Sequence, residues 1–398
     1  MKIQVFSFSL FFSFALISCN PDISGCTDES AANYDSAANV DDASCEYDIV
    51  APAEYVFVDD NGNSTVSYSG QHQRLNMLSE MVTYMKSANT PGAAIEASVL
   101  LSMYANDGYV WLDTDTLGMT GSSKQLKSKT AGGDPAVTAQ FEAWMAELGS
   151  ASAATVSGVF EGGPGVVGVV ETTGTGSGYL QSATGQEWVQ LIEKGLMGAC
   201  FHYNISSVYL GPDKMEVDNT NAVDPDAGKY YTTMEHHWDE AYGYFTVATD
   251  YPEEGTDRFL GKYAWKREDP LGSATKISDA FRLGRAAISE GDMDLRDVQI
   301  EVIRYELERM LGGTAIHYLN AAITDIAEDS RRNHELSEAM AFMQALVYAD
   351  TPAVNQQDVD EVMNALGADF YNVTATSMAA ARDLLAQKLG LTEFVGQL

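Results

Sequence analysis

The chain has 398 residues, of which 45% are hydrophobic, so it is long enough for one large or two ordinary domains. Its 23 Lys and Arg against 57 Asp and Glu give a formal net charge of −34, which argues against binding to nucleic acid or to anionic lipid because carboxylates repel phosphates. With 15 Phe, 20 Tyr and 5 Trp, a disordered acidic chain is also excluded. The composition indicates an acidic globular protein and names no function.

The N-terminus has the features of an export signal. Residues 5–17 form an apolar run that is too short to span a membrane and has the length of a signal-peptide core. The run ends in the Leu-Ile-Ser-Cys of residues 16–19, which resembles a bacterial lipobox. We therefore expect residues 1–18 to be removed as a signal peptide and Cys19 to be lipidated. A plain secretory signal with a stray cysteine is the alternative.

Lipidation of Cys19 would decide where the protein resides. Several acyl chains anchor a protein stably, whereas one chain alone is marginal. Asn20 follows the cysteine in place of the aspartate usually associated with inner-membrane retention. The sequence therefore predicts an outer-membrane lipoprotein that faces the periplasm or the cell surface.

Residues 19–54 are predicted to form a stalk with a small disulfide-closed module. Cys26 and Cys45 bracket it, and a bridge across so short a loop would contribute about 3 kcal/mol. The segment resembles a Cys/Asp-rich repeat of secreted bacterial proteins. Its aspartates favour solvated turns over a Ca²⁺ site. Cys200, set among apolar residues, is interpreted as a buried small side chain.

The remainder, residues 55–398, reads as a helical domain. Residues 55–58 are predicted to be extended, and the turn at 59–63 is no EF-hand because Ser64 and Gly70 occupy the positions that need Gly and Glu. From Gly70 the apolar period becomes 3.6, in one stripe to Met85 and a second over 94–104. Further helices are predicted over residues 134–151, 185–210, 229–248, 274–290, 294–327, 329–349, 356–366 and 376–389.

Capping signals and glycines refine these helices. We expect N-caps at Asp294, Asp329 and Thr376, a C-terminal stop at Gly390, and a bend or split at Gly312-Gly313. The expected fold class is all-α, a helical bundle or two packed bundles.

A glycine-rich stretch, residues 156–184, interrupts the helices. Gly163 to Gly168 formally spell G-x-G-x-x-G, but a dinucleotide site needs that turn to open a helix. Here it leads into Val169–Thr173, whose residue types favour a strand. We interpret the stretch as a hairpin-like insertion.

The segment from Met234 to Phe245 carries the strongest chemical signal. On a helix, an apolar stripe faces inward while His237, Glu240 and Tyr244 share one edge. The same geometry points His236 to solvent and places Glu235 with Asp239 on the opposite edge.

A His and a Glu three residues apart can ligate one metal ion, provided that neighbouring helices supply more ligands. His202 and His317 each fall on an apolar face and are the candidate additions to His237, Glu240 and Tyr244. His334 lies opposite an apolar face and is predicted to be on the surface. The alternative is that the buried histidines are hydrogen-bonded packing residues.

Peptidase and hydrolase signatures are missing from the sequence. There is no H-E-x-x-H, and the inverted H-x-x-E-H fails because Ala241 follows Glu240. Neither a G-x-S-x-G elbow nor a P-loop occurs, so we expect no catalytic activity.

Three motifs carry a family resemblance: Ser69–Leu78, Glu193–Ala199 and His236–Phe245. Over residues 53–398 the chain looks like a family of bacterial lipoproteins known only as a domain of unknown function, which in turn resembles the imelysin-like proteins. The resemblance implies a two-bundle helical lipoprotein linked to iron uptake. Imelysins carry G-x-H-x-x-E; His237 and Glu240 match it, whereas Glu235 stands where the glycine should be.

The sequence thus predicts a non-catalytic envelope lipoprotein that binds iron, another divalent metal or haem in an acidic helical cleft, with an outer-membrane uptake protein as partner. A structural or protein-interaction lipoprotein without a metal site is the leading alternative. A metal-dependent hydrolase is the third.

Overall fold

The computed structural model describes residues 22–29, 31–45, 49–252, 257–350 and 352–398. The signal peptide and the lipidation site at Cys19 lie outside the described residues. The chain divides into two compact units, with the boundary between Val50 and Ala51.

The N-terminal unit is held by one disulfide and one short strand pair. Cys26 and Cys45 are bonded, as predicted. β1 (Ser24–Gly25) pairs in parallel with β2 (Val40–Asp41). The side chains of Asp35, Asp41 and Asp42 each accept a hydrogen bond from a backbone N–H two residues later. These carboxylates therefore stabilise turns.

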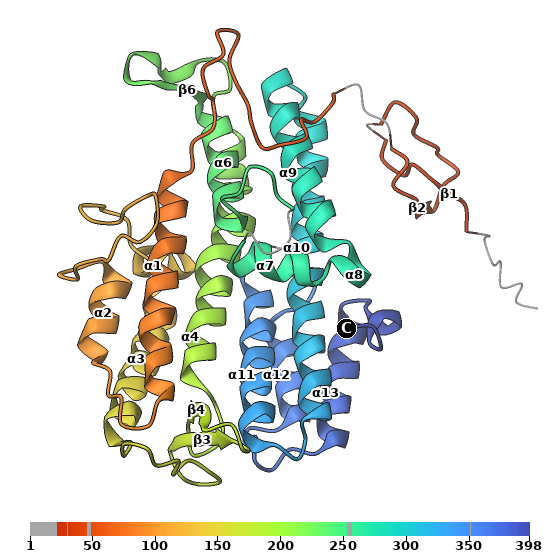
Figure 1. Ribbon diagram of the computed structural model, residues 1–398. Helices are drawn as coiled ribbons and strands as arrows, with labels where there is room; N and C mark the ends of the chain where they lie inside the picture. The colour runs from red at the N-terminus through yellow and green to blue at the C-terminus, as the bar shows by residue number, and fades with distance from the viewer. Residues whose placement is uncertain (1–21, 30, 46–48, 253–256, 351) are drawn as a thin grey trace, which may run out of the picture. The chain divides into compact units, whose positions relative to one another are not determined.

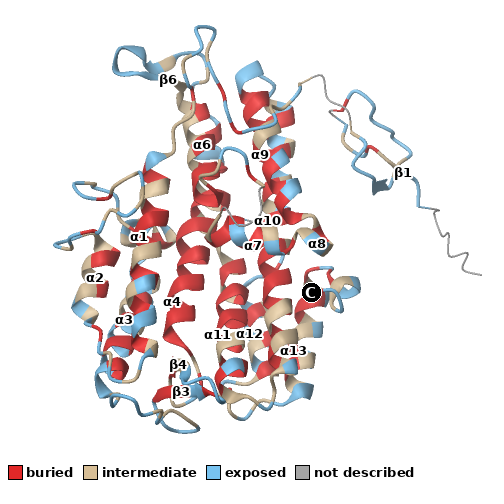
Figure 2. Cartoon of the chain, viewed as in Figure 1, coloured by how far each residue is buried: buried red, intermediate tan, exposed pale blue. Residues whose placement is uncertain are grey.

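The second unit is mainly helical, as predicted, and α4 lies between two groups of helices (Figure 1). It packs against α1 and α3 on one side and α11 on the other. The helices are α1 (Ser69–Lys86), α2 (Ala97–Ala105), α3 (Pro135–Ala154), α4 (Trp188–Leu196), α5 (Pro212–Met215), α6 (Thr233–Phe245), α7 (Phe259–Lys266), α8 (Glu268–Leu271), α9 (Ser273–Glu290), α10 (Met293–Thr324), α11 (Asp329–Ala345), α12 (Gln356–Leu366) and α13 (Ala375–Lys388). Buried residues run along almost the whole of α4 and α6 (Figure 2).

The longest helix, α10, is continuous, so the predicted bend or split at Gly312-Gly313 is wrong. The two glycines instead permit close packing. A Cβ on Gly312 would collide with the Leu389 side chain, and one on Gly313 would lie 2.8 Å from Cδ1 of Leu271. Tertiary packing keeps the helix intact despite the low helix propensity of glycine.

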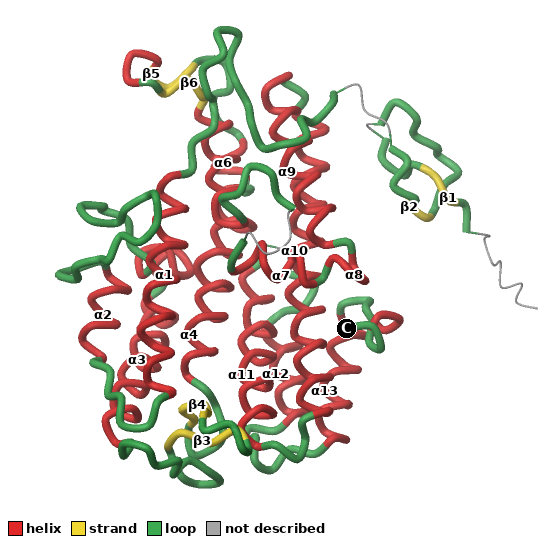
Figure 3. The backbone as a smooth tube through the Cα atoms, in the orientation of Figure 1, coloured by secondary structure: helices red, strands yellow, loops and turns green. Residues whose placement is uncertain are grey.

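The glycine-rich insertion forms the expected hairpin. β3 (Gly168–Thr172) pairs antiparallel with β4 (Ser177–Gln181). A second pair joins β5 (Ala222–Asp224) to β6 (Lys229–Thr232), so the helix predicted from residue 229 begins only at Thr233. In Figure 3 the β3–β4 pair lies at the lower end of the helices and the β5–β6 pair at the upper end, above α6.

The predicted helix over residues 185–210 changes geometry along its length. It begins as α4 and continues as two π-helical segments, η3 (Met197–His202) and η4 (Asn204–Tyr209). π-Helical turns are rare and occur frequently at functional sites. Here η4 packs directly on α6, which carries the His-rich segment.

Several helix ends are displaced from the predicted positions. The N-caps are Asp292, Glu328 and Thr374, one or two residues before the predicted Asp294, Asp329 and Thr376. Gly390, with φ +66°, follows Leu389, the C-cap of α13, and so lies at the predicted C-terminal stop. The sequence did not predict α5, α7 or α8.

Within the described part of the chain, no helix combines the length and the apolar character that a membrane span requires.

Candidate functional site

The His-rich segment forms α6, which starts at a capping box. The Thr232 hydroxyl accepts from the backbone N–H of Glu235, whose carboxylate accepts from the backbone N–H of Thr232. The predicted apolar stripe is buried: Met234, Trp238, Ala241 and Phe245.

Glu235 and Asp239 lie on the opposite edge, as predicted, and both bind Arg285 of α9. The Arg285 guanidinium donates to Glu235 at 2.7 Å and to Asp239 at 3.1 Å. Asp239 also accepts from the Tyr55 hydroxyl at 2.8 Å and from the Ser67 backbone N–H at 2.9 Å. Burial raises the pKa of Asp239 to about 6, although the Arg285 charge acts in the opposite direction. This cluster, the Arg285 hub, joins the N-terminal part of the domain to α6 and α9.

Glu240 is the centre of a second polar cluster, the Glu240 centre. Its carboxylate accepts hydrogen bonds from Gln71 of α1 at 2.8 Å and from Tyr209 of η4 at 3.2 Å, and it lies 3.3 Å from Nδ1 of His237. Burial alone would raise the pKa of Glu240, but the hydrogen bond with His237, together with the charge of His236 and the bond from Gln71, lowers it to about 2. The carboxylate is therefore ionised and surrounded by donors supplied by the fold.

His236 is less exposed than predicted. Its Nδ1 lies 3.0 Å from the Ser67 carbonyl oxygen and its ring stacks on Tyr231, which leaves 31% of the side chain exposed. Burial lowers the pKa of His236.

The other predicted metal ligands bind elsewhere in the fold. His202 is fully buried, with Nδ1 3.1 Å from the Ala345 carbonyl oxygen, and burial lowers its pKa to about 4. His317 is only half-buried, and its Nδ1 lies 3.0 Å from the C-terminal residue's carbonyl oxygen, at Leu398. Tyr244 is buried beside Tyr209, with ring centroids 6.0 Å apart.

Of the five proposed metal ligands, the structure therefore joins His237 to Glu240. Among the described residues, no group of three or more His, Cys, Asp or Glu side chains is arranged to hold a metal ion. The five residues do not fit a metal site made by the protein alone. Cys200 is buried, as predicted, and burial raises the pKa of its thiol to about 12.

His334 is less exposed than predicted, with 22% of its side chain accessible to solvent. Its ring stacks on Tyr179 of β4, and its Nδ1 lies 2.5 Å from the fully buried Glu187 carboxylate. Burial lowers the pKa of His334, but Glu187 outweighs this effect and raises it to about 8. The hairpin covers the face of α11 that a single-helix projection assigns to solvent.

The second resemblance motif, Glu193–Ala199, contributes charged side chains to the region around His334, because Glu338 lies near both His334 and Lys194. Lys194 of α4 forms ion pairs with Glu193 at 2.8 Å and with Glu338 of α11 at 3.4 Å. All three side chains are nearly inaccessible to solvent. The motif's charged residues thus join α4 to α11.

The first resemblance motif, on α1, anchors the loop that contains Asp115, Leu117 and Gly118. The sequence did not predict this role for the loop. His72 lies 3.2 Å from the Asp115 carboxylate, Gln73 donates to the Gly118 carbonyl oxygen, and Asn76 donates to that of Leu117, both at 2.9 Å. The clue in the sequence was the polar side chains on this helix, because polar groups that become buried require hydrogen-bond partners.

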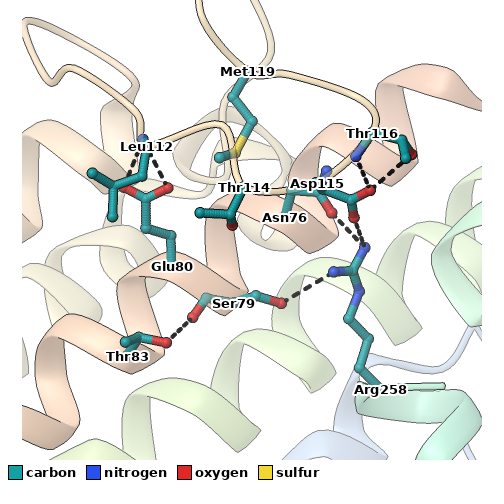
Figure 4. Close-up of a pocket in the computed structure, with 10 residues that line it drawn as sticks. All are labelled: Asn76, Ser79, Glu80, Thr83, Leu112, Thr114, Asp115, Thr116, Met119 and Arg258. Carbon is teal, nitrogen blue, oxygen red and sulfur yellow. Dashed lines mark hydrogen bonds and ion pairs between the residues drawn. The ribbon is translucent and has the colours of Figure 1, made fainter. Parts of the chain in front are cut away.

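Between this loop and α1 lies a cavity of about 440 Å³, drawn in Figure 4. Arg258, which precedes α7, reaches it, and we call it the Arg258 cavity. Sequence reasoning missed the cavity because residues far apart in the chain line it.

The fold and these clusters define a helical-bundle domain whose motif residues are internally bonded. The chain belongs to the family described as "Domain of unknown function (DUF4856)", whose model matches residues 52–392. No curated relative and no solved structure matches the chain.

Proposed function

We propose that this protein is a non-catalytic lipoprotein of the bacterial cell envelope, anchored through Cys19, whose acidic helical domain binds a protein partner. The observation that carries the proposal is that the carboxylates of the α6 motif are hydrogen-bonded within the fold. Glu235, Asp239 and Glu240 all accept hydrogen bonds from donors of the fold. Because these carboxylate oxygens hold the helices together, they are not free to exchange protons with a substrate. This supports a binding role over acid–base catalysis.

The net charge of −34 indicates how such a partner would be recognised. A strongly acidic surface attracts a basic partner surface, and this attraction weakens as salt screens it. The partner that we propose is the outer-membrane uptake protein implied by the family resemblance.

Metabolic labelling with palmitate tests the anchor. The wild-type protein should incorporate label and sediment with outer membranes, whereas Cys19→Ser should do neither. Unlabelled wild-type protein in the soluble periplasmic fraction would contradict the proposal. Chemical cross-linking in intact cells tests the partner, and the cross-linked species should diminish as the salt concentration rises.

A metal-binding role is the second candidate, favoured by the orientation of His237. Glu240 fixes the His237 ring through Nδ1, as carboxylates commonly do for metal-ligating histidines. Nε2 of His237 has no protein partner within the described part of the chain, and 14% of the side chain is exposed. Since the protein does not supply a full ligand set, the metal would arrive with ligands of its own, as chelated iron or haem does.

Elemental analysis of untagged protein separates the two candidates. Near-stoichiometric iron or zinc in the wild type, lost in a His237→Ala, Glu240→Ala double variant and retained in His72→Ala, would favour the metal role. His72 is a matched control because it also lies beside a carboxylate, that of Asp115. If the protein contains no metal after incubation with Fe²⁺, Fe³⁺, Zn²⁺ or haem, the metal role is excluded and the interaction role remains.

A further inference from the structure

The Arg258 cavity is built from groups that the fold holds in place. The Arg258 guanidinium bonds to the Asn76 side chain, lies 3.5 Å from the Ser79 hydroxyl, and lies 3.6 Å from the Asp115 carboxylate. Asp115 in turn contacts His72. The motif on α1 therefore fixes both the loop and the arginine, so the cavity is preorganised.

The opposite end of the cavity is fixed by Glu80 of α1. Its carboxylate accepts hydrogen bonds from the Leu112 backbone N–H at 3.2 Å and from the Tyr109 hydroxyl at 2.8 Å. The loop is thus tied to α1 at both ends. Preorganisation of this kind reduces the entropy lost when a ligand binds.

The charges that line the cavity favour a neutral ligand. Glu80 and Asp115 are acidic and Arg258 is basic. An anion would meet two carboxylates in a protein whose net charge is already −34, and a cation would meet the guanidinium. A ligand with hydroxyl groups can donate to the carboxylates and accept from the arginine at once.

The rest of the lining consists of hydroxyl groups and apolar side chains. Figure 4 shows Thr83 and Thr114 beside the cavity, along with Leu112 and Met119. Thr114 is exposed, and its hydroxyl has no hydrogen-bond partner among the residues the structure describes. Hydroxyls interspersed with methyl and methylene groups match a molecule that carries both O–H and C–H surfaces.

We propose that the Arg258 cavity binds a neutral carbohydrate of one or two sugar residues. The volume of about 440 Å³ lies within the range of roughly 300–1,000 Å³ typical of small-molecule sites. This site is separate from the anchor and from the Glu240 centre, so its test is independent of the proposed function.

Saturation-transfer NMR and calorimetry on the full-length protein test the proposal. The panel is glucose, galactose, mannose, N-acetylglucosamine, maltose and lactose, with glucuronate and Ca²⁺ as charged comparisons. At least one neutral sugar should bind saturably. The Thr83→Val, Thr114→Val double variant should weaken its Kd at least tenfold, and Arg258→Met, checked for folding by circular dichroism, should weaken it further.

Thr376→Val is the control, because Thr376 is an exposed threonine of α13 outside the cavity. It should bind the sugar with unchanged Kd. Folded wild-type protein that binds no neutral sugar, binding that persists in both cavity variants, or preferential binding of glucuronate or Ca²⁺ would each overturn the proposal.

Discussion

Nε of Arg285 lies 3.1 Å from Oδ1 of Asp239, and neither side chain is accessible to solvent. The same guanidinium reaches Glu235 at 2.7 Å and the Thr65 hydroxyl at 3.0 Å. Phe57 covers its face, with the guanidinium carbon 4.8 Å from the ring centroid. One arginine from α9 thereby connects α6 to the segment that precedes α1.

Replacing Arg285 with Met should destabilise the helical domain strongly. The substitution leaves Asp239 and Glu235 buried without their cation, and breaking a buried pair in this way costs about 3–5 kcal/mol. Chemical denaturation followed by circular dichroism measures the loss. Arg331→Met, at an exposed position of α11, is the control and should change the free energy of unfolding by no more than about 0.5 kcal/mol. Equal effects from the two variants would contradict the Arg285 hub.

The Glu240 centre predicts a specific acid sensitivity. The pKa of Glu240 is lowered from 4.5 to about 2 in the folded protein, so its stabilising contribution is complete above pH 4.5 and declines as the pH falls toward 2. Glu240→Gln removes this term, which amounts to at most about 3 kcal/mol. The stability difference between wild type and variant should therefore shrink between pH 4.5 and 2. A difference that is constant over this window would show that Glu240 titrates normally.

His334 should titrate above its ordinary range. Its folded pKa of about 8, against 6.5, means that the ion pair with Glu187 stabilises the fold fully below pH 6.5 and is lost as the pH rises through 8. Carbon-13 NMR of labelled histidine, assigned with His334→Gln, gives the midpoint directly. A midpoint at or below 6.5 would mean that Glu187 does not hold the ring in its charged form.

Gly312→Ala should destabilise the protein although alanine is the better helix former. The added methyl group collides with Leu389, and overpacking of this kind costs about 1–3 kcal/mol, more than the roughly 1 kcal/mol gained in propensity. A double-mutant cycle with Leu389→Ala isolates the clash. The double variant should be more stable than the sum of the two single effects; strict additivity would place Leu389 away from Gly312.

The local elements of α6 and of the hairpin could be read from the sequence because their signals are local. The apolar stripe of α6 and the edge shared by His237 and Glu240 follow from helical periodicity alone. The strand after Gly168 follows from residue types. The capping residues were off by one or two positions, since several neighbouring residues can cap a helix.

Errors arose where a distant segment decides the environment of a residue. The exposure of His334 is overestimated because a single helix gives no sign that Tyr179 and Glu187 partly cover it. Gly312 was interpreted as a break because Leu389, 77 residues later, cannot be placed beside it from sequence. His202 was correctly placed inside the fold, but its carbonyl partner at Ala345 was not foreseeable.

The sequence by itself determined the all-α class, the disulfide pair and the positions of the polar motifs, because periodicity, cysteine spacing and residue type act over short distances. Only the tertiary structure decided what those motifs do. Gln71 and Tyr209 converge on Glu240, Arg285 converges on Asp239, and Arg258 converges on Asp115. The partners come from separate elements: α1 and η4 packed on α6 supply Gln71 and Tyr209, α9 packed on α6 supplies Arg285, and the residue before α7 supplies Arg258.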